Sequence, residues 1–460
     1  MKILTSLSIF FLIVLMAMPL LSQLETPPEG SQPKDFVLPT VKKFSLDNGF
    51  KVSLVNYGEL PKAVVRIVIG AGNINESKEG VWLADITMDL LKEGTSSMNA
   101  GDIARKAAGM GGTVNTAVGL DQSWIGGEVL SEFTPDLVSL LAEILQKPGF
   151  PEKEFERLKK DYLRNLNIQK SRPQSLAQEK FLGVLYGDHP YGRFFPSESM
   201  ISGYTLDQVK IFYGNNVGAL RAHIYVVGRF NAEKVEKAIR NSFSTWKAGE
   251  ESYVNIPEPQ SKRMIYLVNR AEAPQSTIYL GLPVIDPTQE DFFPMLVTNT
   301  LLGGYFSSRV TSNIREDKGY TYSPRSSITN HFRDAYWVQT ADVSTDVTGA
   351  ALKEIFYEID RLQNEAPTEE ELEGVQNYMA GIFVLRNSSR SGIVGQLAFM
   401  NLHGLDDYLS NYVKNIYAVT PQDVQEMAQK YLKDQEMTIV IVGDPEKVPA
   451  QVKRFAEIVY

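Results

Sequence analysis

Residues 205–228 read TLDQVKIFYGNNVGALRAHIYVVG, and residues 420–443 read TPQDVQEMAQKYLKDQEMTIVIVG. The two segments align without a gap at a constant offset of 215 residues, which pairs Thr205 with Thr420. Each copy begins with a threonine that is followed three positions later by an amide or acidic residue, a pattern that caps the start of a helix. Each copy ends in a run of apolar, β-branched residues, which is typical of a buried strand. A repeat of this kind predicts two equivalent structural units.

A second pair of segments matches at nearly the same offset: PEKEFERLKKDYLRNL begins at Pro151 and PTEEELEGVQNYMAGI begins at Pro367. We therefore predict two homologous domains, residues 36–250 and 256–460, joined by a hinge in the stretch KAGEESYVNIPEPQSKR. Strand-like segments such as FKVSLVNY and AVVRIVIGAG alternate with long amphipathic helices. The pattern predicts an α+β fold, in which each domain is a largely antiparallel sheet with helices packed on one face.

The N-terminus has the features of a targeting segment. Lys2 is followed by an apolar run from Ile9 to Leu21, and residues 1–22 are therefore predicted to be a secretory signal peptide. Residues 23–35 are Pro-rich and polar, as expected for a tether outside the fold. We expect an exported protein whose folded part lies in the periplasm. It would contact the membrane only if the signal is retained as an anchor.

Composition excludes several function classes. The net charge is −9 and no Lys/Arg-rich stretch is present, which argues against a general nucleic-acid binder. The absence of cysteine excludes disulfides, a lipid-attached cysteine and thiolate chemistry. No two of the four histidines are close enough in sequence to form a His-x-x-x-His helix pair, so each is interpreted as structural or as a surface residue; they are His189, His223, His331 and His403.

The string GVWLADITMDLLKEGT, residues 80–95, resembles the metal-binding helix of the insulinase (pitrilysin-like, mitochondrial-processing-peptidase-like) zinc peptidases. Active members carry His-x-x-Glu-His there, ahead of a Gly-Thr. The two histidine positions fall on Asp85 and Asp89, and the position of the general-base glutamate falls on Met88. Aligning FERLKKDYLRNL with the later helix that carries the third ligand places that ligand at Asn165. The resemblance implies that this chain binds no zinc and no other cofactor.

Physical chemistry leads to the same expectation. Zinc peptidases need two neutral imidazoles on one helix face and a base that deprotonates the metal-bound water, and Met88 cannot accept a proton. Asp85 and Asp89 do share a helix face, so a hard cation such as Ca²⁺ is an alternative to solvated or hydrogen-bonded aspartates.

The string GGTVNTAVGLDQSWIGGEVL, residues 111–130, resembles the family's edge-strand region, to which a substrate peptide adds as an extra β-strand. Asn115 and Asp121 match the family there, and the resemblance implies that Asn115 binds substrate. The alternative is an ordinary hairpin of the core sheet.

LLGGYFSSRVTSNIREDKGYTYS, residues 301–323, resembles the family segment that carries an arginine and a tyrosine seven residues apart. These residues map to Arg315 and Tyr322. The resemblance implies that Arg315 binds the substrate backbone. It also implies that the Tyr322 hydroxyl donates to the scissile carbonyl as negative charge develops on it. The alternative is an arginine that ties down a helix end and a tyrosine that packs in the core.

Some bacterial members of this family divide the work between two chains, of which one carries the zinc motif and the other supplies the Arg/Tyr pair. The resemblance therefore implies a non-catalytic subunit of an exported two-chain zinc metallopeptidase. Its two domains close like a clamshell, its substrate is a peptide, and zinc is held by a homologous partner subunit. A structural or peptide-binding scaffold is the alternative, and the absent histidine pair disfavours a stand-alone metallopeptidase.

Overall fold

The computed structural model of the chain describes residues 37, 39–252 and 255–460. The predicted signal peptide, 1–22, and the tether, 23–35, lie outside the described residues. Within the described part, no helix is both long and apolar enough to cross a membrane.

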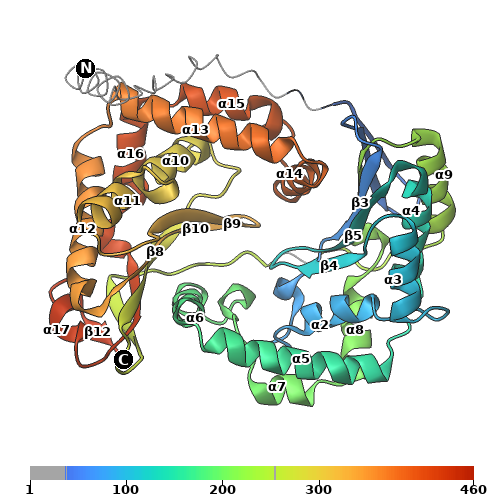
Figure 1. The fold of residues 1–460 in the computed structure, drawn as a ribbon, viewed down its shortest axis with the longest axis horizontal. Coiled ribbons are helices and arrows are strands. Elements are labelled where there is room, and N and C mark those ends of the chain that lie inside the picture. The colour runs from blue at the N-terminus through green and yellow to red at the C-terminus, as the bar shows by residue number, and fades with distance from the viewer. Residues whose placement is uncertain (1–36, 38, 253–254) are drawn as a thin grey trace, which may run out of the picture. The chain divides into compact units, whose positions relative to one another are not determined.

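The first half of the chain builds a six-stranded sheet (Figure 1). The strand order is β1-β2-β6-β3-β5-β4, and the strands are antiparallel except for the parallel pair of β2 and β6. The strands are β1 Val41–Ser45, β2 Lys51–Asn56, β3 Lys62–Ile69, β4 Asn115–Val118, β5 Ser123–Leu130 and β6 Ala222–Gly228. We call the half that contains this sheet the N-terminal domain.

The second half of the chain builds a second six-stranded sheet, in the order β12-β7-β11-β8-β10-β9. Its strands are β7 Met264–Asn269, β8 Gln275–Val284, β9 Arg325–His331, β10 Asp334–Ser344, β11 Thr438–Gly443 and β12 Ile458–Val459. Five of these strands, β7-β11-β8-β10-β9, repeat the order and directions of β2-β6-β3-β5-β4 in the first sheet, including the parallel pair, which here is β7 and β11. We call this half the C-terminal domain.

The repeat found in the sequence falls on equivalent elements of the two domains. Thr205 and Thr420 each accept a hydrogen bond from the backbone N–H three residues later and so cap the helices α8 and α16. The apolar runs that follow are β6 and β11, the third strand of each sheet. The prediction of two homologous α+β domains is therefore confirmed, whereas the boundaries 36–250 and 256–460 stay predictions.

Eight helices of at least five residues lie in the described part of the N-terminal domain. They are α2 Leu83–Leu91, α3 Ala100–Gly109, α4 Thr134–Gln146, α5 Glu152–Lys170, α6 Pro173–Tyr186, α7 Glu198–Gly203, α8 Leu206–Asn216 and α9 Ala232–Phe243. The α-helices of the C-terminal domain are α10 Phe292–Asn299, α12 Thr348–Asn364, α13 Glu369–Asn387, α14 Arg390–His403, α15 Tyr408–Ala418, α16 Pro421–Tyr431 and α17 Val448–Val452, together with the three-residue turn α11 Arg309–Thr311.

Each sheet is covered on its second face by a helix from the other domain. The N-terminal sheet packs its own helices α4 and α9 on one face and receives α14 on the other (Figure 1). In return, α6 packs on β8 and β11 of the C-terminal sheet. The predicted arrangement of helices on one face therefore holds for each domain's own helices. The opposite face is also apolar, because strands such as β11 are buried along their whole length.

Candidate functional site

The helix that resembles the metal-binding helix is α2, and its polar side chains are already paired. Asp89 accepts hydrogen bonds from three side chains: Lys92 at 2.7 Å, Thr116 at 2.9 Å and Tyr162 at 2.7 Å. Burial alone would raise the pKa of the Asp89 carboxyl, but the hydrogen bonds from Lys92 and Tyr162 outweigh it, and the pKa is lowered. Asp89 is thus a charged carboxylate held by donors of this chain.

Asp85 of the same helix forms a second, more buried pair of acids with Glu76, which lies in the segment before the helix. Asn73 Nδ2 donates to Asp85 at 2.8 Å and to Glu76 at 3.2 Å, and Glu76 also accepts the backbone N–H of Ala84 at 2.8 Å. Burial, with the neighbouring Asp85 charge, raises the pKa of Glu76 to about 8. Burial raises the pKa of Asp85 to about 6. At neutral pH the Glu76 carboxyl is therefore largely protonated, which removes the repulsion between two neighbouring negative charges.

The residues at this position do not fit zinc. Met88 is 3% exposed and packs in the core of the sheet. Asn165 is exposed on α5, and Tyr162, one turn earlier on this helix, is the residue that donates a hydrogen bond to Asp89 of α2. Among the residues that the structure describes, no group of three or more histidine, aspartate or glutamate side chains is arranged to hold a metal ion. The carboxylate that is best placed, Asp89, uses both of its oxygens on protein donors.

Arg315 and Tyr322 are brought together on the surface of the C-terminal domain. The Arg315 guanidinium carbon lies 4.9 Å from the centroid of the Tyr322 ring and 4.3 Å from that of Phe306. Cation–π contacts at these distances hold the guanidinium over the rings. Tyr322 is 80% exposed and Phe306 is 62% exposed. The alternative of a tyrosine packed in the core is therefore wrong for Tyr322.

The backbone around this pair is anchored, while Tyr322 stays exposed and the half-buried Arg315 side chain lies 3.1 Å from Glu316 Oε1. Arg315 lies in a π-helical turn, Ser312–Asp317, of a kind that is frequent at functional sites. Thr321, next to Tyr322, bridges to β10 and donates its hydroxyl to the Asp342 carbonyl at 2.7 Å. Just before the turn, Arg309 makes a two-pronged ion pair with Glu371 of α13, at 2.7 and 2.8 Å.

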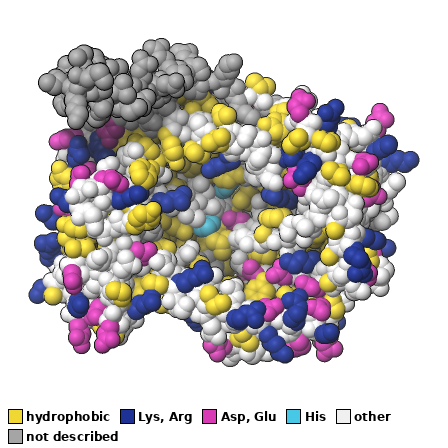
Figure 2. Space-filling view, viewed as in Figure 1, with side chains coloured by type: hydrophobic (Ala, Val, Ile, Leu, Met, Phe, Trp, Pro, Cys, Tyr) yellow, Lys and Arg dark blue, Asp and Glu magenta, His cyan; other side chains and the backbone are white. Residues whose placement is uncertain are grey.

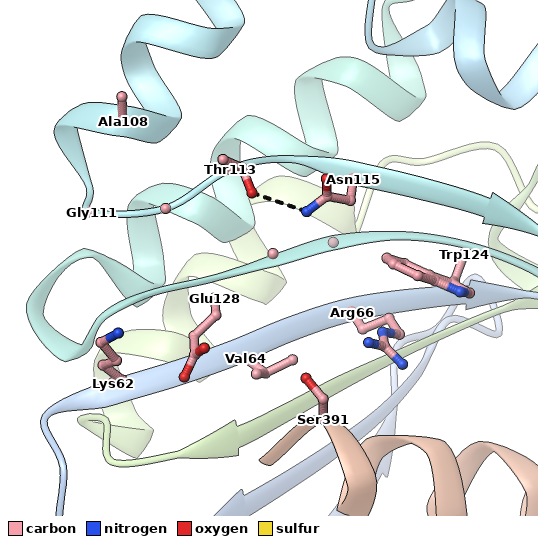
Figure 3. Close-up of a pocket in the computed structure, with 13 residues that line it drawn as sticks. Lys62, Val64, Arg66, Ala108, Gly111, Thr113, Asn115, Trp124, Glu128 and Ser391 are labelled. Carbon is pink, nitrogen blue, oxygen red and sulfur yellow. Dashed lines mark hydrogen bonds between the residues drawn. The ribbon is translucent and has the colours of Figure 1, made fainter. Parts of the chain in front are cut away.

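Asn115 begins β4, which is the edge strand of the N-terminal sheet. Its Nδ2 donates to Thr113 Oγ1 at 3.0 Å. Asn115 lines a cavity of about 540 Å³ over β3, β4 and β5 (Figure 3). The described contacts join Asn115 neither to Arg315 and Tyr322 nor to the aspartates of α2. The sequence-predicted residues thus share no direct contact, although Thr116, the residue after Asn115, joins β4 to Asp89 of α2.

Asp121 has a structural environment between the two domains. It accepts hydrogen bonds from the Tyr191 hydroxyl and, at 3.2 Å, from the backbone N–H of Phe332. The buried His331 ring lies 4.5 Å from that of Tyr191, and burial lowers the pKa of His331 to about 4. His331 is therefore neutral at physiological pH and packs as an aromatic ring. On the face shown in Figure 2, histidine side chains are visible in a central hollow, and charged side chains of both signs are intermixed around it.

Two residues that contact the aspartates of α2 were not found from the sequence. Tyr162 lies on the helix that was correctly paired with α2, and its spacing of one turn from Asn165 is the signal that would have found it. Glu76 lies in an irregular segment after β3, where no periodicity fixes which side chain turns inward.

Comparison with known proteins identifies the family. Residues 51–195 match the insulinase family, peptidase family M16, and residues 203–379 match the peptidase M16 inactive domain. The chain therefore belongs to the insulinase (M16) family of peptidases. Among its relatives, an uncharacterized zinc protease YmxG from Bacillus subtilis is 22% identical, over 89% of this chain and 100% of that protein. A protein named non-peptidase homolog YmxG from Helicobacter pylori is 23% identical, over 84% of this chain and 90% of that protein.

Solved structures agree with this membership. A peptidase M16 inactive domain from Pseudomonas fluorescens superposes with a TM-score of 0.81 at 26% identity, covering 88% of this chain and 98% of that chain. The periplasmic protease PqqL from Escherichia coli superposes with a TM-score of 0.76 at 13% identity, and this chain spans 47% of it. The second likeness shows the fold alone.

Proposed function

We propose that this chain is the non-catalytic subunit of an exported two-chain zinc metallopeptidase. In this role it binds the peptide substrate, and a homologous subunit that carries the intact zinc motif supplies the metal chemistry. Arg315 would hold the peptide backbone, and Tyr322 would donate its hydroxyl to the scissile carbonyl oxygen as negative charge develops there.

The observation that carries the proposal is the exposure of Tyr322 beside the half-buried Arg315. A tyrosine that is 80% exposed contributes little to the core of its own domain, yet its ring is held under the Arg315 guanidinium. The Arg309 ion pair and the Thr321 hydrogen bond anchor the backbone that precedes Tyr322, which limits the positions that its hydroxyl can take. Such a geometry suits a donor that acts on a group outside this chain.

The side chains around Asp89 of α2 support the same division of roles between two subunits. Asp89 and its three donors occupy the place that resembles a metal site, so hydrolysis needs another polypeptide. The name of the Helicobacter pylori relative, a non-peptidase homolog, is consistent with such a role. The apolar stretch after Lys2 supports export to the periplasm.

The test is reconstitution with the zinc-bearing subunit, isolated by pull-down from the native periplasm. This chain alone should cleave no peptide, and the mixture should cleave one in a chelator-sensitive manner. Tyr322→Phe should lower kcat of the mixture by about 10²-fold, because one oxyanion donor is lost. Tyr357→Phe, at a 52% exposed position of α12, is the matched control and should have no effect.

A Tyr322→Phe mixture that cleaves as fast as the wild type would rule out the catalytic role of the hydroxyl. Co-purification of the two subunits without any gain in activity would favour the scaffold alternative. In that case the exposed pair would serve only to bind peptide or partner.

A further inference from the structure

The cavity beside Asn115 has a positive lining that the proposed function leaves unused. It lies on the face of the N-terminal sheet that receives α14, opposite to the face covered by α4 and α9. Arg66 and Lys62 of β3 reach into it, and Trp124 of β5 forms a wall (Figure 3). With a volume of about 540 Å³ the cavity is large enough for a peptide side chain and its neighbours.

The two cations of the lining have no anionic partner. Within the described residues, neither the Arg66 nor the Lys62 side chain makes a hydrogen bond or an ion pair, and Arg66 only stacks over the Trp124 ring, with its guanidinium carbon 4.2 Å from the ring centroid. Arg66 is half-buried, and burial lowers its pKa. A guanidinium that is partly removed from water without a partner costs free energy, which a bound anion would recover.

The one carboxylate in the lining is already neutralised. Glu128 accepts two hydrogen bonds from Arg390, one of them from Nε at 2.8 Å. This ion pair joins β5 to the first residue of α14. The remaining charge of the lining is therefore that of Arg66 and Lys62, in a chain whose net charge is −9.

The start of α14 adds to the positive potential. Ser391, the second residue of this 14-residue helix, lines the cavity, and its side chain lies below Val64 and Arg66 in Figure 3. The first turn of a helix carries a partial positive charge from its free N–H groups, which favours an anion.

The cavity also adjoins a surface to which a peptide can add. The edge strand β4 pairs with β5 on one side only. The Asn115 amide donates to Thr113, so that its oxygen remains available to accept a peptide N–H. Glycines line the floor and leave the space open; they are Gly111, Gly112, Gly126 and Gly127. A Cβ at Gly126 would meet the Val65 carbonyl oxygen at 2.3 Å and the Arg66 Cα at 2.8 Å, so a side chain could not be accommodated beside Arg66.

We propose that this cavity binds a carboxylate of the peptide and thereby makes the chain selective for acidic peptides. Arg66 and Lys62 pair with the carboxylate, while the peptide backbone lies along β4. The carboxylate comes either from an aspartate or glutamate side chain or from the C-terminus of the peptide. This inference rests on the proposed function, since it names the substrate class of the same subunit.

The experiment measures peptide binding to the full chain by fluorescence anisotropy at constant ionic strength. Three labelled peptides of alanine, threonine and valine are matched in length. One has an internal glutamate and an amidated C-terminus, the second has glutamine in its place, and the third has glutamine and a free C-terminus. At least one of the two carboxylate peptides should bind about tenfold more tightly than the neutral one, because a charge-assisted hydrogen bond is gained. Which of them does so identifies the source of the carboxylate.

Arg66→Gln should remove this preference, and Arg66→Lys should retain part of it. Lys237→Gln is the matched control and should leave the preference unchanged. Lys237 is an exposed cation on α9, the helix that covers the opposite face of the sheet. Thermal unfolding of each variant checks that it is folded.

The inference is overturned if all three peptides bind equally, if none binds, or if the preference survives Arg66→Gln. Failure of the proposed function is a separate result, because it is measured as loss of the Tyr322 dependence in the reconstituted mixture. A mixture that cleaves with that dependence but shows no carboxylate preference would refute only the role of the cavity.

Discussion

The Tyr162 hydroxyl donates a hydrogen bond of 2.7 Å to Asp89 Oδ2 and so joins α5 to α2. The other oxygen of Asp89 accepts from Lys92 and Thr116, which adds β4 to the same network. The position that aligns with the family's metal ligand is therefore one where hydrogen bonds connect α2, α5 and β4. The aspartate there contributes to folding, which is a different task from the one that a metal ligand performs.

Tyr162→Phe is expected to lower the free energy of unfolding by about 1–2 kcal/mol, because a hydrogen bond to a charged, partly buried carboxylate is lost. Urea denaturation measures the change. Tyr357→Phe removes a hydroxyl from a 52% exposed side chain and should change stability by less than about 0.5 kcal/mol. Equal stability of the Tyr162 variant and the wild type would contradict a structural role of the network.

The isolated chain is expected to retain no stoichiometric zinc after equilibrium dialysis and gel filtration. Both oxygens of Asp89 are occupied by donors, and the neighbouring position is the buried Met88. Metal analysis of the purified chain is the measurement. One tightly bound zinc per chain, together with chelator-sensitive proteolysis, would overturn both this prediction and the proposed division of labour.

The sequence was sufficient to predict the duplication, because the two capping threonines and the two buried strands are local features. It did not predict that α6 and α14 are exchanged between the domains. The faces of a strand such as β11 are both apolar, and that pattern tells which strands are buried but not which helix covers them. Contacts between residues so far apart in sequence leave no local signal.

The candidate site shows the same limit. The family resemblance singled out Arg315 and Tyr322, and in the structure the guanidinium carbon lies 4.9 Å from the centroid of the tyrosine ring. The π-helical turn that carries Arg315 was not predicted, because its extra residue per turn depends on packing against neighbouring helices. The sequence did not identify Arg66 as a candidate binding residue. A single cation in an apolar strand indicates a binding site only when the structure shows that it has no ion-pair partner.

Glu76→Gln is expected to flatten the pH dependence of stability. The pKa of Glu76 is raised to about 8 in the folded chain, whereas in the unfolded chain it lies near 4.5. The folded state therefore keeps a proton that the unfolded state releases. The stabilising contribution is fully present below about pH 4.5 and is lost as the pH rises through about 8. Glutamine stays neutral and can keep the bond from the Ala84 N–H, so the variant should lack this loss.

The measurement is urea denaturation of both proteins at a series of pH values between 4.5 and 8. Glu370→Gln, an exposed position in the first turn of α13, is the control and should follow the wild-type curve. If the curves of wild type and Glu76→Gln run parallel, then Glu76 does not hold its proton in the folded state.

Phe181→Ala is expected to loosen the contact between the domains as well as to lower stability. Phe181 of α6 is 1% exposed, and its ring centroid lies 5.5 Å from that of Tyr336 in the C-terminal sheet. Removing a buried phenylalanine costs about 3–5 kcal/mol. Because the carbonyl of Leu185 in the same helix accepts the backbone N–H of Gln260, a displaced α6 should also release the segment that joins the domains.

Phe243→Ala is the matched control, since Phe243 is fully buried but stacks on Phe50 of its own domain at 4.4 Å. Both variants should lose a similar amount of stability in urea, but only Phe181→Ala should increase limited proteolysis within residues 255–263, where Gln260 contacts α6. The comparison separates a general loss of packing from a loss of contact between the domains, because only one of the two rings lies between them. Equal cleavage of the two variants would mean that α6 does not hold the C-terminal domain in place.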